Sequence, residues 1–209
     1  MIKESAEEDE RRLLFLSDVL SSHELVQTTT GTMLLLKGLD GKYGGRRLGS
    51  ERMLPFAPES MQAEVKKALL EDLGEELGTS EMNHLLGALR NLPEVTKEGY
   101  DLIVQKYQSD PKLGNAPTAL AFGVSAEKWL QAMKAASPTE KLVDLKEERK
   151  ISVLGSLVRL VGEKKFSTLS NEEKSEVVEF VIDALQSENK EIRETAFDAS
   201  VYVAGNPLG

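Results

Sequence analysis

The sequence predicts an all-α protein, and three observations carry this prediction. Aromatic residues make up only 5% of the 209 residues, and the alternating runs of β-branched residues that are typical of strands are scarce. Leu, Ala, Glu and Lys instead recur at three- and four-residue spacings, as they do on amphipathic helices. Stretches rich in glycine and proline separate these segments.

The first part of the chain is predicted to be an N-terminal helical segment over residues 1–38. Ser5 is followed by acidic residues, so a hydroxyl and a carboxylate can satisfy the free N–H groups of a first helical turn. Residues 39–58 hold too much glycine and proline for a helix, and we interpret them as a long basic loop. Loops of this length are commonly functional or mobile, so this one is a candidate site or hinge.

The remaining residues, 59–209, are predicted to form an array of helices joined by short breaks. The first helix carries apolar residues at four-residue steps on one face: Met61, Val65, Leu69, Leu73 and Leu77. Gly78 ends it, and the next helix is predicted to end before Pro93. Further helices are predicted over residues 95–107, 125–136 and 151–161. The connection 110–117 is rich in helix breakers. Ser137 has the spacing of a helix start. The charged run from Lys146 to Lys150 interrupts the helical spacing of apolar residues.

The last two segments form the best-defined helical hairpin, with helices on either side of a break at residues 186–189. Ser170 supplies a capping box with Glu173. Each helix presents apolar residues, the first on one face: Val177, Val178, Val181, Ile182 and Leu185 from the first helix, and Ile192, Ala196, Phe197, Ala199, Val201 and Val203 from the second. Small residues in the second helix allow close approach of a neighbouring helix.

Residues 184–196 resemble the turn and second helix of a HEAT repeat. In that family a short polar turn precedes an aliphatic–Arg pair and alanines; here Asn189, Ile192-Arg193 and Ala196 stand at those positions. The resemblance covers about 35 residues, 170–204, and implies a hydrogen-bonding, structural role for Arg193. It also implies an α-solenoid-like array of antiparallel helical hairpins over residues 59–209. An irregular helical bundle is the alternative fold.

The net charge of −9 and the absence of cysteine exclude several classes of function. Without cysteine there are no thiol nucleophiles, Cys-based zinc sites or iron–sulfur ligands. The acidity disfavours nucleic acid and anionic membranes as partners of the whole surface. The charged start and short apolar runs predict no membrane insertion and favour a cytoplasmic protein, the alternative being an exported protein whose leader has been removed.

No pattern in the sequence predicts a catalytic, cofactor or metal site. His23 and His84 fall in different predicted helices and lack companions at ligand spacing. The carboxylate runs are interleaved with Lys and Arg, as on solvated helix faces. Phosphate-loop, dinucleotide-binding and nucleophile-elbow motifs are absent. The single tryptophan, Trp129, is predicted to pack in the core, the alternative being an anchor at an interface.

One segment runs against the overall acidity. Residues 37–52 carry a net charge of +3, and their candidate partner-binding residues are Lys42, Tyr43, Arg46, Arg47 and Arg52. Such a cluster can dock an acidic partner, a phosphorylated peptide or nucleic acid, or it can merely balance acidic neighbours.

The sequence therefore predicts a non-catalytic protein–protein interaction or scaffold module, not an enzyme. The surfaces nominated for the partner, another protein, are the basic segment and the exposed face of the C-terminal hairpin. The alternatives are a nucleic-acid-associated helical repeat protein that uses the basic segment, and an enzyme that depends on carboxylates alone.

Overall fold

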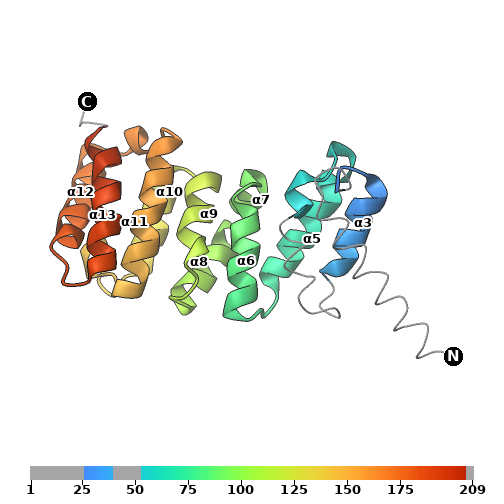
Figure 1. The fold of residues 1–209 in the computed structure, drawn as a ribbon, viewed down its shortest axis with the longest axis horizontal. Coiled ribbons are helices and arrows are strands. Elements are labelled where there is room, and N and C mark those ends of the chain that lie inside the picture. The colour runs from blue at the N-terminus through green and yellow to red at the C-terminus, as the bar shows by residue number, and fades with distance from the viewer. Residues whose placement is uncertain (1–25, 40–52, 206–209) are drawn as a thin grey trace. The chain divides into compact units, whose positions relative to one another are not determined.

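The computed structural model describes residues 26–39 and 53–205, and every regular element in these two ranges is helical (Figure 1). The predicted fold class is confirmed at this level. The chain divides into two compact units, Met1–Val95 and Thr96–Gly209, here called the N-terminal unit and the C-terminal unit. None of the described helices is both long and apolar enough to cross a bilayer.

The described part of the N-terminal unit contains short helices built around α5. Its elements are α3 (Thr29–Gly38), η1 (Leu54–Phe56), η2 (Glu59–Met61), α5 (Gln62–Gly74) and α6 (Thr79–Leu89). The face predicted for α5 is buried as far as Leu73, and the helix ends one residue later at Gly74. Helix α3 contacts η1 and η2, and α5 contacts η2 and α6.

The C-terminal unit contains the longer helices. Helix α7 (Pro93–Glu98) leads into it, and its elements are α8 (Tyr100–Ser109), α9 (Asn115–Gly123), α10 (Ala126–Ala135), η3 (Leu142–Asp144), α11 (Glu147–Gly162), η4 (Phe166–Thr168), α12 (Asn171–Leu185) and α13 (Lys190–Ala204). Packing passes from α8 to α9, from α9 to α11 and from α11 to α13, while α10 packs on α9 and α12 on α13. Within this unit α12 and α13 lie at the opposite end from α8 (Figure 1).

The largest fully buried side chain of the C-terminal unit is that of Trp129. Trp129 is fully buried, and its indole N–H donates a hydrogen bond of 3.2 Å to the carbonyl of Pro117. The indole therefore buries its apolar area without leaving its polar atom unsatisfied. The prediction that Trp129 packs in the core is confirmed.

Two basic side chains satisfy helix C-termini inside this unit. The guanidinium of Arg149, only 6% exposed, donates to the carbonyl of Ala136 and, at 3.0 Å, to that of Gln108. The Lys165 ammonium donates to Ala121 and Phe122 at 2.8 and 2.5 Å. The last carbonyls of a helix have no partner within it and carry partial negative charge, so the buried Arg149 and the half-buried Lys165 are stabilised there.

Four sequence predictions for this unit are wrong in detail. The helix predicted over 95–107 is two helices, α7 and α8, because Gly99, a poor helix former, separates them. The connection 110–117 was expected to lack structure, yet α9 begins inside it. Pro117 is the third residue of α9, where its missing N–H is not needed.

The other two differences concern the approach to α11. Ser137 does not start a helix: its N–H donates to the carbonyl of Lys134, so it ends α10, and Glu140 with φ of 57° reverses the chain. The charged run from Lys146 to Lys150 does not interrupt the pattern but begins α11, because carboxylates in a first turn favour the positive end of the helix dipole.

Candidate functional site

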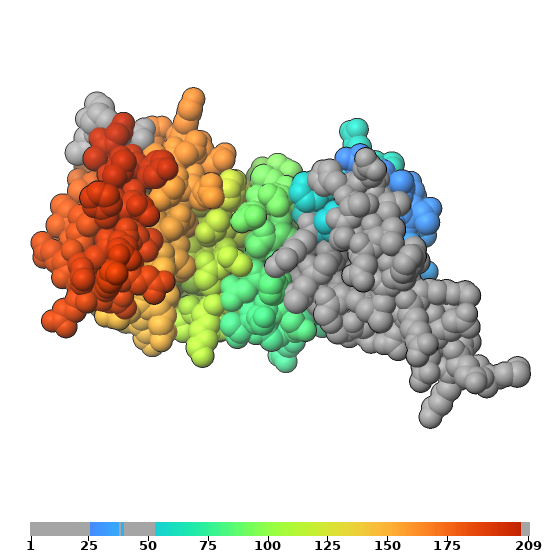
Figure 2. Space-filling model, in the orientation of Figure 1, coloured from blue at the N-terminus to red at the C-terminus, as the bar shows by residue number. Residues whose placement is uncertain are grey.

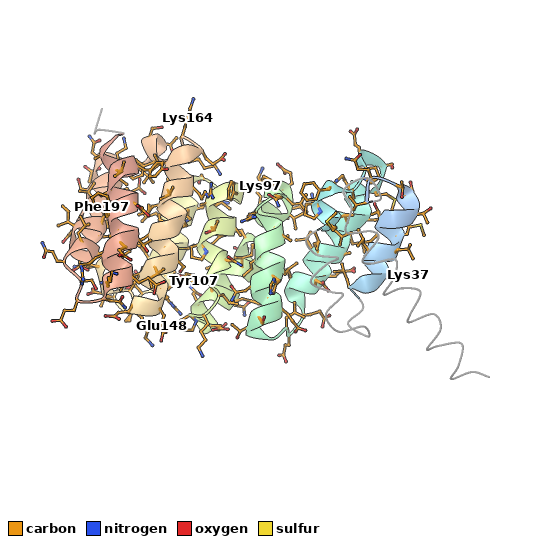
Figure 3. All side chains as sticks on the ribbon, in the orientation of Figure 1. Lys37, Lys97, Tyr107, Glu148, Lys164 and Phe197 are labelled. Atoms are coloured by element: carbon orange, nitrogen blue, oxygen red, sulfur yellow. The ribbon has the colours of Figure 1, made fainter. Side chains whose placement is uncertain are left out.

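The most prominent surface feature of the C-terminal unit is a group of exposed apolar side chains on its last two helices. Ile182 and Leu185 of α12 are 51% and 36% exposed, and Phe197 and Val201 of α13 are 64% and 60% exposed. We call these four residues the C-terminal strip. Phe197 is labelled at α13, beside α12, in Figure 3, and the red atoms of the last helix lie at the surface of the view in Figure 2.

The sequence groups all four strip residues with the core residues of their helices, but the structure leaves these four exposed. One narrow face of each helix is buried in the core. Its residues are Val177, Phe180, Val181 and Ala184 on α12, and Ile192, Ala196, Ala199 and Val203 on α13. In an α-helix each residue advances by about 100°, so Phe197 and Val201 lie well away from the line through Ala196 and Ala199. The signal was present in the sequence, because apolar residues cover more of the circumference of each helix than one buried face requires.

The border of the strip is acidic. Glu179, Glu194 and Asp198 each precede a strip residue by three positions, which makes them its neighbours on the helix surface. Residues 170–205 carry nine carboxylates and three basic side chains, a net charge of −6.

Two of the three basic side chains are already engaged. Lys190 pairs with Glu194 at 3.4 Å on the exposed surface. Arg193 donates to the carbonyls of Ser187 and Glu188, both at 2.7 Å, and so bonds the turn between α12 and α13. The surface around the strip is therefore negative.

The start of α12 and the turn into α13 are fixed by caps. The Ser170 hydroxyl accepts from the N–H of Glu173, and the Glu173 carboxylate accepts from the N–H of Ser170, so the predicted capping box is confirmed. The Asn189 side chain accepts from the N–H of Glu191 and donates to Glu147 of α11 at 3.2 Å.

Ion pairs hold the same hairpin to the rest of the unit. Lys150 of α11 pairs with Asp183, and Lys134 of α10 pairs with Glu176, both at 2.8 Å. These caps and ion pairs anchor α12 and α13 to the rest of the C-terminal unit.

The partner-binding residues predicted from the sequence are not part of the C-terminal strip. Lys42, Tyr43, Arg46, Arg47 and Arg52 lie outside the described residues, as does His23. Of the basic segment 37–52, Lys37 is described; it is exposed in the last turn of α3. The prediction that this segment binds a partner stays a prediction.

A pocket of about 350 Å³ lies between α10 and the start of α12. The residues that line it are Leu130, Gln131, Lys134, Ala135, Glu140 and Glu173. Its two carboxylates are poor candidates for acid–base chemistry, since Glu140 is exposed and Glu173 is used in the capping box. Among the described residues, no three His, Asp or Glu side chains are grouped to hold a metal ion.

Comparison of the chain with protein-family models, with curated proteins and with solved structures finds no match.

Proposed function

We propose that this protein is a non-catalytic protein-interaction module, built on HEAT-like stacked helical hairpins, whose partner binds across the C-terminal strip. The single observation that carries the proposal is the exposure of Ile182, Leu185, Phe197 and Val201 on two helices that pack on each other. Scattered exposed apolar residues are ordinary, but a cluster bordered by charge is typical of a protein-binding surface.

The size of the strip supports this function. A large apolar side chain offers roughly 200 Å² of surface, so four side chains that are about half exposed present on the order of 400 Å². The largest apolar patch on a typical monomer is about 300–600 Å² and is often functional. Phe197, the most exposed of the four, is the kind of aromatic side chain that anchors interfaces.

The architecture supports the HEAT-like part of the proposal. The succession α9, α11, α13 forms one row of adjacent helices, and α13 turns a line of small residues, Ala196 and Ala199, toward its core. Arg193 bonds the turn of its own hairpin, and Asn189 reaches the preceding helix. Both contacts are of the structural kind that the resemblance implies.

Site-specific photo-crosslinking in the cells that make the protein tests the proposal. A photoreactive amino acid at position 197 should capture a protein that the same group at position 102 does not. Leu102 on α8 is a matched control, because it is also an exposed apolar residue of the C-terminal unit.

The captured protein is then purified and its affinity is measured for variants of the full chain. Phe197→Ser should weaken binding by about tenfold or more, as expected for an interface anchor, whereas Leu102→Ser should leave it unchanged. Phe197→Ser should lower stability by no more than about 0.5 kcal/mol, because this side chain is 64% exposed. Leu102 is 36% exposed, so Leu102→Ser should cost more, about 1–2 kcal/mol, and circular dichroism verifies that both variants are folded. Equal loss with both variants, or equal capture from both positions, contradicts the proposal.

A further inference from the structure

We infer that the occupant of the C-terminal strip is a basic amphipathic helix of another protein, an inference that rests on the proposed function. The partner would place an apolar face on Ile182, Leu185, Phe197 and Val201 and flank that face with Lys or Arg. Three properties of the described residues lead to this partner chemistry: the charge at the border, the helical form of the surface, and the cost of self-association.

The charge at the border selects a cationic partner. Glu179, Glu194 and Asp198 stand one helical turn from strip residues, and the hairpin as a whole carries −6. Among the described residues, neither Glu179 nor Asp198 has an ion-pair partner, and the pair between Lys190 and Glu194 is exposed at 3.4 Å. Lys or Arg side chains at the rim of an interface would neutralise these carboxylates and speed association.

The form of the surface selects a helix. The strip is carried by two adjacent helices, with Phe197 and Val201 four residues apart on α13 and Ile182 and Leu185 three apart on α12. Ridges at these spacings accept the side chains of a further helix in their grooves. The described residues contain no strand, so they offer no sheet edge to which an extended peptide can add.

The same charges oppose a second copy of the chain as the occupant. In a two-fold symmetric dimer through the strip, each copy meets the identical surface of the other. Two hairpins of −6 would then face each other, and like charges placed together across an interface cost several kcal/mol. A basic helix gains from the charge that disfavours the dimer.

The test uses the full-length chain and two synthetic 18-residue peptides. Both carry Leu at helical spacing on one face; one has Lys on its remaining face and the other has Glu. Fluorescence anisotropy measures their binding. The basic peptide should bind at least about tenfold more tightly than its acidic twin, and higher salt should weaken its binding.

Variants locate the peptide on the strip. Phe197→Ser should weaken the basic peptide about tenfold and Leu102→Ser should not. Replacing the border carboxylates together (Glu179→Gln, Glu194→Gln and Asp198→Asn) should remove most of the difference between the two peptides. Circular dichroism of each variant verifies that it is folded.

Two results overturn the inference. One is equal binding of the two peptides, or binding of the basic peptide that Phe197→Ser does not weaken. The other is a dimer in sedimentation that Phe197→Ser dissociates, which would make a second copy the occupant. Neither result contradicts the proposed function, which fails if positions 197 and 102 capture proteins equally, or if Phe197→Ser and Leu102→Ser weaken the captured partner equally.

Discussion

Replacing Arg149 with methionine removes a buried positive charge while keeping a side chain of similar length. In the C-terminal unit the Arg149 guanidinium joins the end of α8, through Gln108, to the end of α10, through Ala136. It also lies 5.2 Å from the centre of the Tyr107 ring. Methionine fills the same space but satisfies neither carbonyl, so the ends of two helices lose their shared donor.

The expected loss follows from these contacts. Hydrogen bonds from a charged donor contribute about 1.5–3 kcal/mol each, so two of them amount to roughly 3–6 kcal/mol. Removing the cation also relieves its desolvation penalty, which offsets part of that loss. We expect Arg149→Met to lower the free energy of unfolding by about 2–4 kcal/mol, or the urea midpoint by about 1–2 M at an m-value near 2 kcal/mol/M.

Tryptophan fluorescence during urea unfolding is the assay. Trp129 is the only tryptophan of the chain and lies in the core of the C-terminal unit, so its emission reports on the unit that contains Arg149. Arg159→Met is the matched control, because Arg159 lies on the same helix but is exposed, and its loss should cost less than about 0.5 kcal/mol. If the two variants unfold at the same urea concentration, the bridging role of Arg149 is refuted.

Two further predictions use the same assay. A Cβ at Gly123 would lie 2.3 Å from the Cβ of the buried Thr96, so Gly123→Ala should destabilise the unit by about 1–3 kcal/mol. A Cβ at Gly155, in the middle of α11, meets no atom within 4 Å, so Gly155→Ala should stabilise the unit by about 0.5–1 kcal/mol. If both variants change stability in the same direction, this account is contradicted. Burial raises the pKa of Tyr107 to about 12, against the opposing influence of Ser152 and Arg149. The stability that this tyrosine contributes is therefore complete below pH 10 and is lost as the pH rises toward 12, by roughly 1.4 kcal/mol per pH unit. Tyr107→Phe should flatten the fall in stability between pH 10 and pH 12, and parallel curves for the two proteins would contradict the assignment.

The sequence was informative about elements that are decided locally. The Ser170 capping box and the break between α12 and α13 depend on neighbouring residues, and both were predicted correctly. The position of Pro117 within a helix was not predicted, because it depends on which turn of the helix the proline occupies. The role of Ser137 also required knowledge of where α10 ends.

The candidate site was the least predictable part. Periodicity shows that Ile182 and Phe197 are apolar, but it does not show which apolar line of a helix finds a neighbour. Tertiary packing decides which residues are buried: here Ala196 and Ala199 lie in the core, and Phe197 is exposed to solvent. The buried charge of Arg149 was missed for a related reason, since its partners are carbonyls 13 and 41 residues away in the chain.

The footprint that the captured partner leaves on the full-length chain is the most direct test of the central claim, that the outer face of α12 and α13 is the binding surface. Hydroxyl-radical footprinting compares the oxidation of side chains in the free protein and in the complex. Protection of Ile182 and Phe197, with Leu102 unchanged, is the predicted result. Protection confined to Tyr43 and its basic neighbours, with Phe197 still fully reactive, would contradict the claim and move the binding surface to the basic segment.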